Sequence, residues 1–200
     1  MADKRFCLER AAIGEVKLVA IDFETADHGA DSACALGIVT IEKGRIRRKG
    51  YRLIRPPRRD FVFSYLHGIT WNDIEREATF AEVWDAFRDY WQDADYLVAH
   101  NAAFDRGVLA ACSVAVGRVP PDFPFVCTVK IARWHWNFRP AKLPIVCARL
   151  GIPLKHHDAE SDALACASIA LRAMNEGFPI HTAIVGGNRD PAWEPRPVES

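Results

Sequence analysis

The stretch VKLVAIDFET, residues 16–25, is a nearly continuous apolar run that ends in two carboxylates. Such a run predicts a β-strand that is buried on both faces, and we expect it over Val16–Phe23. Because side chains alternate along a strand, Asp22 and Glu24 point to the same side at its end. Two carboxylates at this spacing suit the ligation of one metal ion.

Two further strands are expected directly afterwards, over Ala35–Ile41 and Ile46–Ile54. They are joined at Lys43-Gly44, where the glycine permits a tight turn, so the three strands form an antiparallel meander. Helices and strands then alternate, and capping and stop residues mark the helix ends. The pattern predicts a helix over Phe80–Gln92, a strand over Tyr96–Ala99, a helix over Ala102–Val116, a weaker strand over Phe125–Thr128 that leads into another helix, and helices over Lys142–Leu150 and Ala159–Glu176.

Length and composition indicate one globular domain with short extensions. The chain has 200 residues, of which 50% are hydrophobic, enough for a sizeable core. We expect an N-terminal extension at residues 1–14, the domain at 15–178, and a tail at 179–200 that contains several prolines and glycines. The longest charge-free apolar stretch, Gly107–Gly117, is too short to cross a bilayer, and the N-terminus has no apolar segment. We therefore expect a cytoplasmic protein without a membrane partner.

Charge is balanced over the whole chain but polarised along it. The 26 basic and 26 acidic residues leave no net field that would attract a polyanion. One segment nevertheless carries only basic charges, namely Arg45, Arg47, Arg48, Lys49, Arg52, Arg55, Arg58 and Arg59. This pattern is typical of an edge strand protected by charge and equally of a surface that follows phosphates, and the sequence leaves both interpretations open.

Carboxylates also stand at or just after apolar runs further along the chain. Asp105 ends LVAHNAAFD, residues 97–105, and Asp162 ends HHDAESD, residues 156–162, where His157 stands five positions earlier. A charge next to a buried run needs a partner, and a divalent cation is a good one. Carboxylates without thiolates favour Mg²⁺ or Mn²⁺ over zinc. The sequence therefore predicts a metal site assembled from separate segments.

These segments match, in order, three motifs of a known family. D-x-E-T stands as Asp22–Thr25, the second motif as His100–Asp105, and H-x-A-x-x-D as His157–Asp162. Over Leu18–Met174 the chain resembles the DEDDh group of 3′-to-5′ exonucleases, whose relatives include the proofreading epsilon subunit of bacterial DNA polymerase III. The resemblance implies an α/β fold of the ribonuclease-H-like type, with a mixed five-stranded sheet, three antiparallel strands followed by parallel ones, flanked by helices.

The resemblance also implies an activity. This is hydrolysis of phosphodiesters from the 3′ end, with release of nucleoside 5′-monophosphates, by a mechanism that uses two Mg²⁺ or Mn²⁺ ions. By the family pattern, the metal ligands and catalytic carboxylates are Asp22, Glu24, Asp105 and Asp162. His157 is the general base that deprotonates the attacking water, a task suited to a group that titrates near neutrality.

Substrate-binding groups are implied around the first two motifs. The backbone from Phe23 to Thr25 holds the terminal 3′-hydroxyl, Asn101 and Phe104 line the path of the last nucleotides, and His67 touches the strand. For Phe104 and His67, a role in the core or in a turn explains the residue equally well.

Other features bear on substrate preference rather than on the metal ligands. Trp134 and Trp136 are candidates for base stacking, although aromatic residues beside a helix usually pack. Ala26-Asp27-His28 and Ala78 depart from residues that many relatives have at these places.

Two classes of function follow from these features. The first is a metal-dependent exonuclease of proofreading or repair type that acts on the 3′ end of a single-stranded nucleic acid. DNA is favoured, and RNA 3′-end trimming stays open because the motifs do not sense the 2′-hydroxyl. The second is a non-catalytic module that binds nucleic acid or a polymerase, with the tail around Trp193 docking to a polymerase or repair complex. The intact ligand set favours the enzyme.

Overall fold

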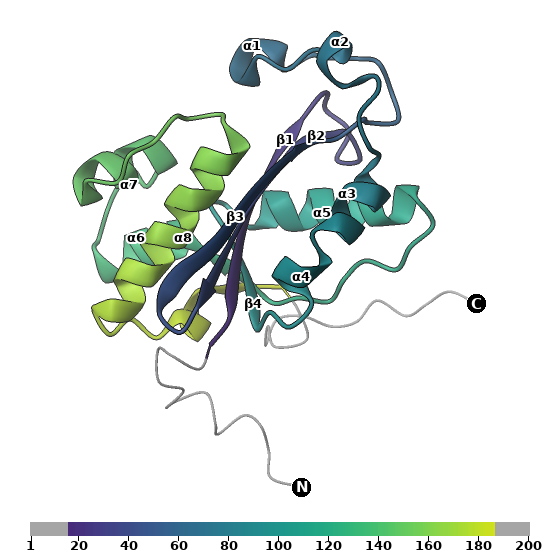
Figure 1. Ribbon diagram of the computed structural model, residues 1–200. Coiled ribbons are helices and arrows are strands. Elements are labelled where there is room, and N and C mark those ends of the chain that lie inside the picture. Colours follow the sequence, from purple (N-terminus) through teal and green to yellow (C-terminus); the bar gives the residue numbers. More distant parts are fainter. Residues whose placement is uncertain (1–15, 187–200) are drawn as a thin grey trace, which may run out of the picture.

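Six strands form one mixed sheet at the centre of the computed structural model, which describes residues 16–186. Within this range the strand order is β3-β2-β1-β4-β5-β6 (Figure 1). The strands are β1 (Leu18–Thr25), β2 (Ala33–Glu42), β3 (Arg45–Leu53), β4 (Tyr96–Ala99), β5 (Phe125–Cys127) and β6 (Ile184–Val185). The first three form the predicted antiparallel meander, and β4 and β5 follow in parallel, with β4 beside β1. The predicted fold class is therefore confirmed.

The sixth strand is not among the five that the sequence predicts. β6 pairs antiparallel with Phe125–Val126 of β5, and it follows a 3-10 helix at Ile180–Ala183 whose first and last side chains are buried. The expectation of no packed element after Phe178 is wrong here, because a strand of two residues carries no periodicity to read. Residues 1–15 and 187–200 lie outside the described part, so the division into extension, domain and tail remains a prediction.

The helices in the described part are α1 (Ser64–His67), α2 (Trp71–Ile74), α3 (Phe80–Ala86), α4 (Arg88–Trp91), α5 (Ala103–Ala115), α6 (Thr128–His135), α7 (Leu143–Leu150) and α8 (Ala159–Asn175). The helix predicted over Phe80–Gln92 is divided, because the backbone of Phe87 leaves the helical conformation between α3 and α4. The four-residue helices α1 and α2 are too short to show a repeating pattern in the sequence. Between residues 16 and 186, none of the helices combines the length and the apolar character needed to cross a bilayer.

Helices cover both faces of the sheet (Figure 1). On the face that carries α6, α7 and α8, Leu18 and Ala20 of β1 join a core that includes Ile169 of α8. On the face that carries α3, α4 and α5, Val19 and Ile21 of β1 pack with apolar side chains of α3 and α5. All of these side chains are fully buried, and each of the larger ones contributes about 1.5–3 kcal/mol by leaving water. β1 is thus buried on both faces, as its apolar run predicts.

Candidate metal centre and active site

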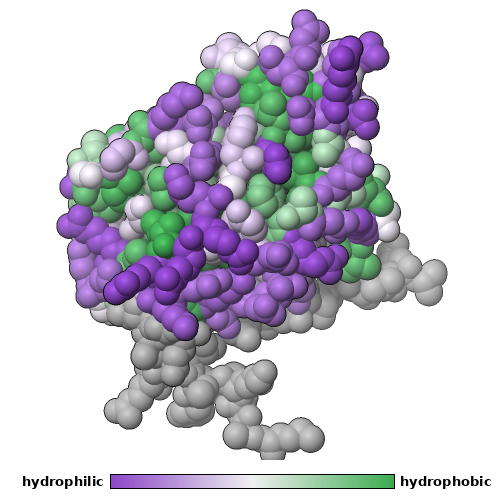
Figure 2. All heavy atoms as spheres, in the orientation of Figure 1, coloured by the Kyte–Doolittle hydropathy of each residue, from purple (hydrophilic) through white to green (hydrophobic). Residues whose placement is uncertain are grey.

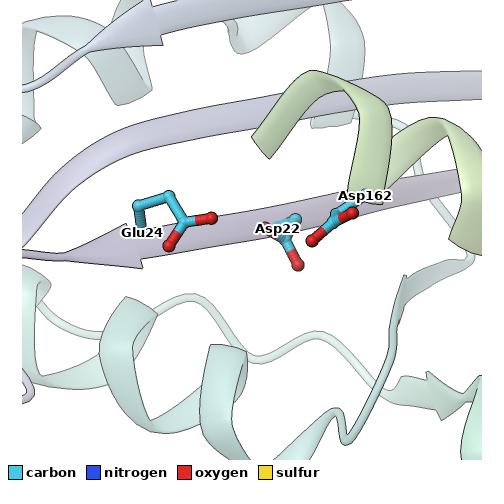
Figure 3. Close-up of side chains that lie close together, drawn as sticks. All are labelled: Asp22, Glu24 and Asp162. Carbon is cyan, nitrogen blue, oxygen red and sulfur yellow. The ribbon is translucent and has the colours of Figure 1, made fainter. Parts of the chain in front are cut away.

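Three carboxylates from two elements meet where the end of β1 approaches α8. Asp22 and Glu24 belong to β1, and Asp162 comes from the first turn of α8 (Figure 3). Each offers one oxygen, and these three oxygens lie within 4.8 Å of one another. Clustered carboxylate oxygens are the ligands that Mg²⁺ and Mn²⁺ prefer. The structure thus brings together three of the four carboxylates that the sequence predicts as metal ligands.

A glycine in β2 allows α8 to come this close to the sheet. Gly37 pairs with Asp22 across the β1–β2 ladder. A Cβ atom at Gly37 would lie 1.9 Å from the carbonyl oxygen of Ala159, the first residue of α8. The side chain of Asp158 caps this helix by accepting a hydrogen bond of 3.1 Å from a backbone N–H of the first turn. The close approach of helix and strand therefore places Asp162 next to Asp22.

The carboxylate of Asp162 is held by one of its two oxygens. Its Oδ2 accepts hydrogen bonds from Nδ1 of His156 at 3.0 Å and from the backbone N–H of His157 at 3.1 Å. Its Oδ1 is buried and has no hydrogen-bond partner among residues 16–186. A buried carboxylate oxygen without a partner is costly, and a bound cation would satisfy it. The donor set and this free oxygen therefore fit a hard divalent cation.

Asp105 lies beside this cluster rather than within it. It stands in the first turn of α5, is 2% exposed, and accepts a hydrogen bond of 3.1 Å from the backbone N–H of Phe23. Burial, together with the charges of Glu24 and Asp162, raises the pKa of Asp105 to about 8. Its influence on the three clustered carboxylates is therefore electrostatic, and a direct place among the ligands is still a prediction.

Burial and mutual repulsion raise the pKa values of the clustered carboxylates as well. The pKa of Asp22 lies well above its usual value, because burial and the charges of Asp105 and Asp162 disfavour the anion. Burial and the charge of Asp162 raise the pKa of Glu24 to about 7. Such groups hold protons near neutral pH unless a cation compensates their charge. The cluster could therefore hold a cation, and without one its repulsion lowers the stability of the folded state.

Two histidines stand at the entrance to α8. The backbone of His157 has a positive φ of 65°, and its ring stacks on that of His156 with 3.9 Å between ring centroids. Burial and the neighbouring His156 lower the pKa of His157, so that its ring is neutral at neutral pH. The sequence singles out His157 alone. The contact of His156 with Asp162 was missed, because a pair of adjacent histidines gives no signal of which ring faces the cluster.

A cavity of about 940 Å³ opens in front of the carboxylates. It is lined by Asp22, Glu24, His157 and Asp162 among the predicted catalytic residues and by Phe23, Thr25, Asn101 and Phe104 among the predicted substrate-binding residues. Asn101 adopts a positive φ of 63°, and Phe104 is 48% exposed, so its ring is a surface group and not a core residue. This volume is large enough for a ligand of nucleotide size.

His67 and the two tryptophans lie outside this lining. The ring of His67 lies behind Thr25, since its Nε2 donates to the carbonyl oxygen of Thr25 at 3.2 Å and its Nδ1 accepts from a backbone N–H at 3.0 Å. Trp136 donates from Nε1 to Glu176 at 2.8 Å, and its ring packs on Phe138. The turn interpretation of His67 and the packing interpretation of Trp136 thus have direct structural support.

A second wall of the cavity was not predicted from the sequence. It includes Ala141 and its neighbours before α7, together with Arg133 from the last turn of α6. His100 holds this wall, because its Nε2 donates to the carbonyl oxygen of Ala141 at 2.9 Å and its Nδ1 accepts from the hydroxyl of Thr128 at 2.8 Å. The second motif, which contains His100, was the only available signal.

A mixed sheet in this order, with acidic residues on its first strand and its last long helix, defines the class of ribonuclease-H-like nucleases. Comparison with known proteins gives the same result and names the family. The family model RNase_T, described as Exonuclease, matches residues 19–170, and the chain belongs to this family. The predicted resemblance to exonucleases of this superfamily is therefore confirmed.

Curated relatives include large bacterial polymerases. The chain is 31% identical over 166 residues to the PolC-type DNA polymerase III of Thermotoga maritima, and 31% identical over 170 residues to that of Bacillus subtilis. In both cases the match covers 81% of this chain and 12% of the relative. The chain therefore spans about an eighth of the length of these polymerases.

Solved structures share the fold. Exonuclease X in complex with 5′ overhanging duplex DNA has a TM-score of 0.66 and 24% identity, with 83% of this chain and 96% of that chain covered. A 3′-exonuclease that recognises the histone mRNA stem-loop has a TM-score of 0.70 and 18% identity, with 82% and 84% covered. At such identities the likeness describes the fold alone.

Proposed function

We propose that the protein is a metal-dependent 3′-to-5′ exonuclease that releases nucleoside 5′-monophosphates from the 3′ end of a single-stranded nucleic acid. One observation carries this proposal. Three carboxylates share a cluster within 4.8 Å at the base of a nucleotide-sized cavity, and one of their buried oxygens lacks a partner in the described part of the chain. The membership of the exonuclease family directs this site toward phosphodiester hydrolysis.

The carboxylates have distinct tasks in this proposal. Asp22, Glu24 and Asp162 would hold two Mg²⁺ or Mn²⁺ ions, and Asp105 would support them from beside the cluster. When bound, the cations supply neutralisation of the charge that develops on the phosphate and lower the pKa of water. His156 keeps the carboxylate of Asp162 in place through its 3.0 Å hydrogen bond.

His157 is the proton acceptor in this scheme. Its lowered pKa keeps the ring neutral at neutral pH, and it lines the cavity beside the carboxylates. Its backbone N–H donates to Asp162, whereas its ring contacts only the ring of His156 among the aromatic and hydrogen-bonding groups of residues 16–186. The ring therefore keeps the freedom to turn toward an attacking water molecule.

Cavity residues near β1 receive the end of the strand. The backbone from Phe23 to Thr25 holds the 3′-hydroxyl, and the exposed ring of Phe104 and the side chain of Asn101 contact the last nucleotides. His67 acts from behind, by fixing the carbonyl oxygen of Thr25. DNA is the favoured polymer because the curated relatives are DNA polymerases, and a proofreading or repair complex is the favoured setting.

Digestion of 5′-labelled DNA and RNA oligonucleotides of one sequence tests the proposal. We expect a ladder that shortens from the 3′ end with Mg²⁺ or Mn²⁺, stops with EDTA and is absent for Asp22→Ala. The faster polymer identifies the substrate, and faster RNA digestion would favour an RNA-trimming enzyme. A folded protein that binds these strands but gives no ladder with either ion would instead be a binding module.

The base assignment has its own test. We expect His157→Ala to lose most of its activity while binding Mn²⁺ in calorimetry as the wild type does. Equal loss of activity and of cation binding would show that His157 supports the carboxylates instead.

The docking role proposed for the C-terminal segment requires a deletion that spares the fold. Removal of residues 187–200 leaves the buried Ile180 and Ala183 in place. We expect unchanged digestion and weaker capture of the polymerase or repair partner, and unchanged capture would remove the docking role.

A further inference from the structure

We propose that Arg133 and Lys142 form a phosphate-binding wall, which holds the strand by a phosphate other than the one that is hydrolysed. The inference rests on the proposed exonuclease function and adds how the strand is gripped. Arg133 lies in the last turn of α6, and Lys142 directly precedes α7. Both line the cavity that contains the carboxylate cluster, and they are its only lysine and arginine in the described part.

The side chains of Arg133 and Lys142 are exposed and have no partner in the described part of the chain. Neither Arg133 nor Lys142 forms an ion pair with any residue between 16 and 186, and neither side chain makes a hydrogen bond there. Arg58, by contrast, forms ion pairs with Asp27 and Asp31. Free guanidinium and ammonium groups in a cavity are suited to a ligand that brings its own negative charges.

The wall that carries these cations is built rigidly. His100 bridges its two parts, because it donates to Ala141, next to Lys142, and accepts from Thr128, at the start of α6. Burial lowers the pKa of His100 to about 4, so this ring is neutral and adds no charge at neutral pH. The positive charge of the wall therefore belongs to Arg133 and Lys142, and the backbone segments that carry them are joined before a ligand arrives.

The two sides of the cavity together define the ligand. Carboxylates with a bound cation receive one phosphate, and the two cationic residues that line the same cavity receive another. A single nucleotide ester has one phosphodiester and leaves the wall unused. A polynucleotide strand has the second phosphate that the wall requires.

The basic residues of β3 are the competing surface. β3 lies at the edge of the sheet, and Figure 2 shows hydrophilic residues gathered over the β2–β3 hairpin. Among residues 16–186, those that line the cavity include none from β3. Two of its cations are already engaged, since Arg48 stacks on Tyr90 and Lys49 forms an ion pair of 3.7 Å with Glu160. The edge-protection interpretation of this strand is therefore the better one.

Strand binding without cleavage gives the first test. Binding of a fluorescein-labelled single-stranded DNA to the full chain is measured by anisotropy in EDTA over a range of NaCl concentrations. We expect Arg133→Gln/Lys142→Gln to raise Kd by about tenfold or more and to reduce the salt slope by about 1.4. The matched double variant Arg47→Gln/Arg52→Gln removes the same charge from β3 and is expected to bind as the wild type does.

A substrate with a single phosphodiester separates this inference from the proposed function. The p-nitrophenyl ester of thymidine 5′-monophosphate offers one phosphodiester and no second phosphate, and we expect the wild type to hydrolyse it in Mg²⁺. We expect Arg133→Gln/Lys142→Gln to keep the wild-type kcat/KM for this ester and to raise KM for the oligonucleotide by about tenfold.

Each other outcome has a definite meaning. A wild type that cleaves neither substrate overturns the proposed function. A wild type that cleaves both, with a wall variant that binds and cleaves the oligonucleotide normally, overturns the phosphate-binding wall alone. Equal losses in the wall variant and the β3 variant, or equal losses on ester and oligonucleotide, also overturn it, because the effect would then be general charge or damage to the site.

Discussion

The two walls of the cavity are stabilised in opposite ways. On one wall, Asp22, Glu24 and Asp162 are crowded together with raised pKa values, and one buried oxygen has no partner in the described part of the chain. On the other, a neutral His100 with both ring nitrogens hydrogen-bonded holds a segment that bears exposed cations. A cation from solution would relieve the crowded charge of the first wall, whereas the polar atoms of His100 at the second wall already have partners within the protein. Binding of metal is therefore coupled to stability at the first wall only.

The largest effect is expected from removing a charge at the carboxylate wall. Asp22→Asn keeps the shape of the side chain but weakens cation binding, so we expect initial rates of oligonucleotide digestion in Mg²⁺ to fall by about a thousandfold or more. Asp93→Asn, an exposed substitution away from the cavity, is the matched control and keeps wild-type rates. Full activity of Asp22→Asn would mean that the cluster is not the catalytic centre.

The contact between sheet and helix that assembles the carboxylate wall gives the second prediction. In Gly37→Ala the new methyl group meets the backbone of Ala159, and we expect a loss of about 3 kcal/mol in the free energy of unfolding. Displacement of α8 moves Asp162 from Asp22, so Mn²⁺ affinity in calorimetry falls as well. Gly107→Ala in α5 is the control, because a Cβ there meets nothing within 4 Å. It should stabilise the helix by about 0.5–1 kcal/mol, and unchanged Mn²⁺ affinity in Gly37→Ala would contradict this account of assembly.

The third prediction concerns the instability of the carboxylate wall without metal. The pKa of Glu24 in the folded protein, about 7, lies above its usual value of 4.5, so the penalty for ionising it grows from pH 4.5 and is complete above pH 7. We expect Glu24→Gln in EDTA to be more stable than the wild type by about 2–3 kcal/mol at pH 8 and equal to it at pH 4. Thermal unfolding measured at both values checks this sign, and a destabilised variant at pH 8 would show that Glu24 is compensated within the protein.

Addition of Mg²⁺ gives a further test of the difference in stability between Glu24→Gln and the wild type. A cation bound only by the folded state stabilises the wild type by RT ln(1 + c/Kd), where c is the concentration of free Mg²⁺. We therefore expect Mg²⁺ to reduce the advantage of Glu24→Gln, while a wall variant such as Arg133→Gln responds to Mg²⁺ as the wild type does.

The difference between the walls also explains what the sequence could reveal. Asp22 and Glu24 stand two residues apart on one strand, and His157 and Asp162 stand five apart, so local spacing and motifs predicted the carboxylate wall. The cationic wall depends on long-range contacts, since His100 and Ala141 are 41 positions apart. No local pattern links them. The two-residue strand β6 and the four-residue helices α1 and α2 were missed for a related reason. Each is too short to show the repeating pattern of apolar residues from which a strand or a helix is predicted.

The smallest effect is expected at His100, and it has the opposite dependence on pH. The folded pKa of His100, about 4, lies below its usual value of 6.5. The unfolded chain therefore takes up this proton first, and the contribution of His100 to stability is lost as the pH falls from about 6.5 to about 4. At the carboxylate wall, stability is lost as the pH rises. The contributions of the two walls to stability thus depend on pH with opposite sign.

His100→Asn isolates this contribution. Because the ring is partly exposed, we discount the full shift and expect the cost of the substitution to be about 2 kcal/mol smaller at pH 4.5 than at pH 7. Urea unfolding of the variant and the wild type at the two pH values measures this difference. Because both proteins contain the other titrating groups, the contributions of those groups to stability cancel. A cost that is equal at both values would mean that His100 is protonated in the folded protein. Its Nδ1 would then carry a proton at pH 4.5 and could no longer accept the hydrogen bond from the hydroxyl of Thr128.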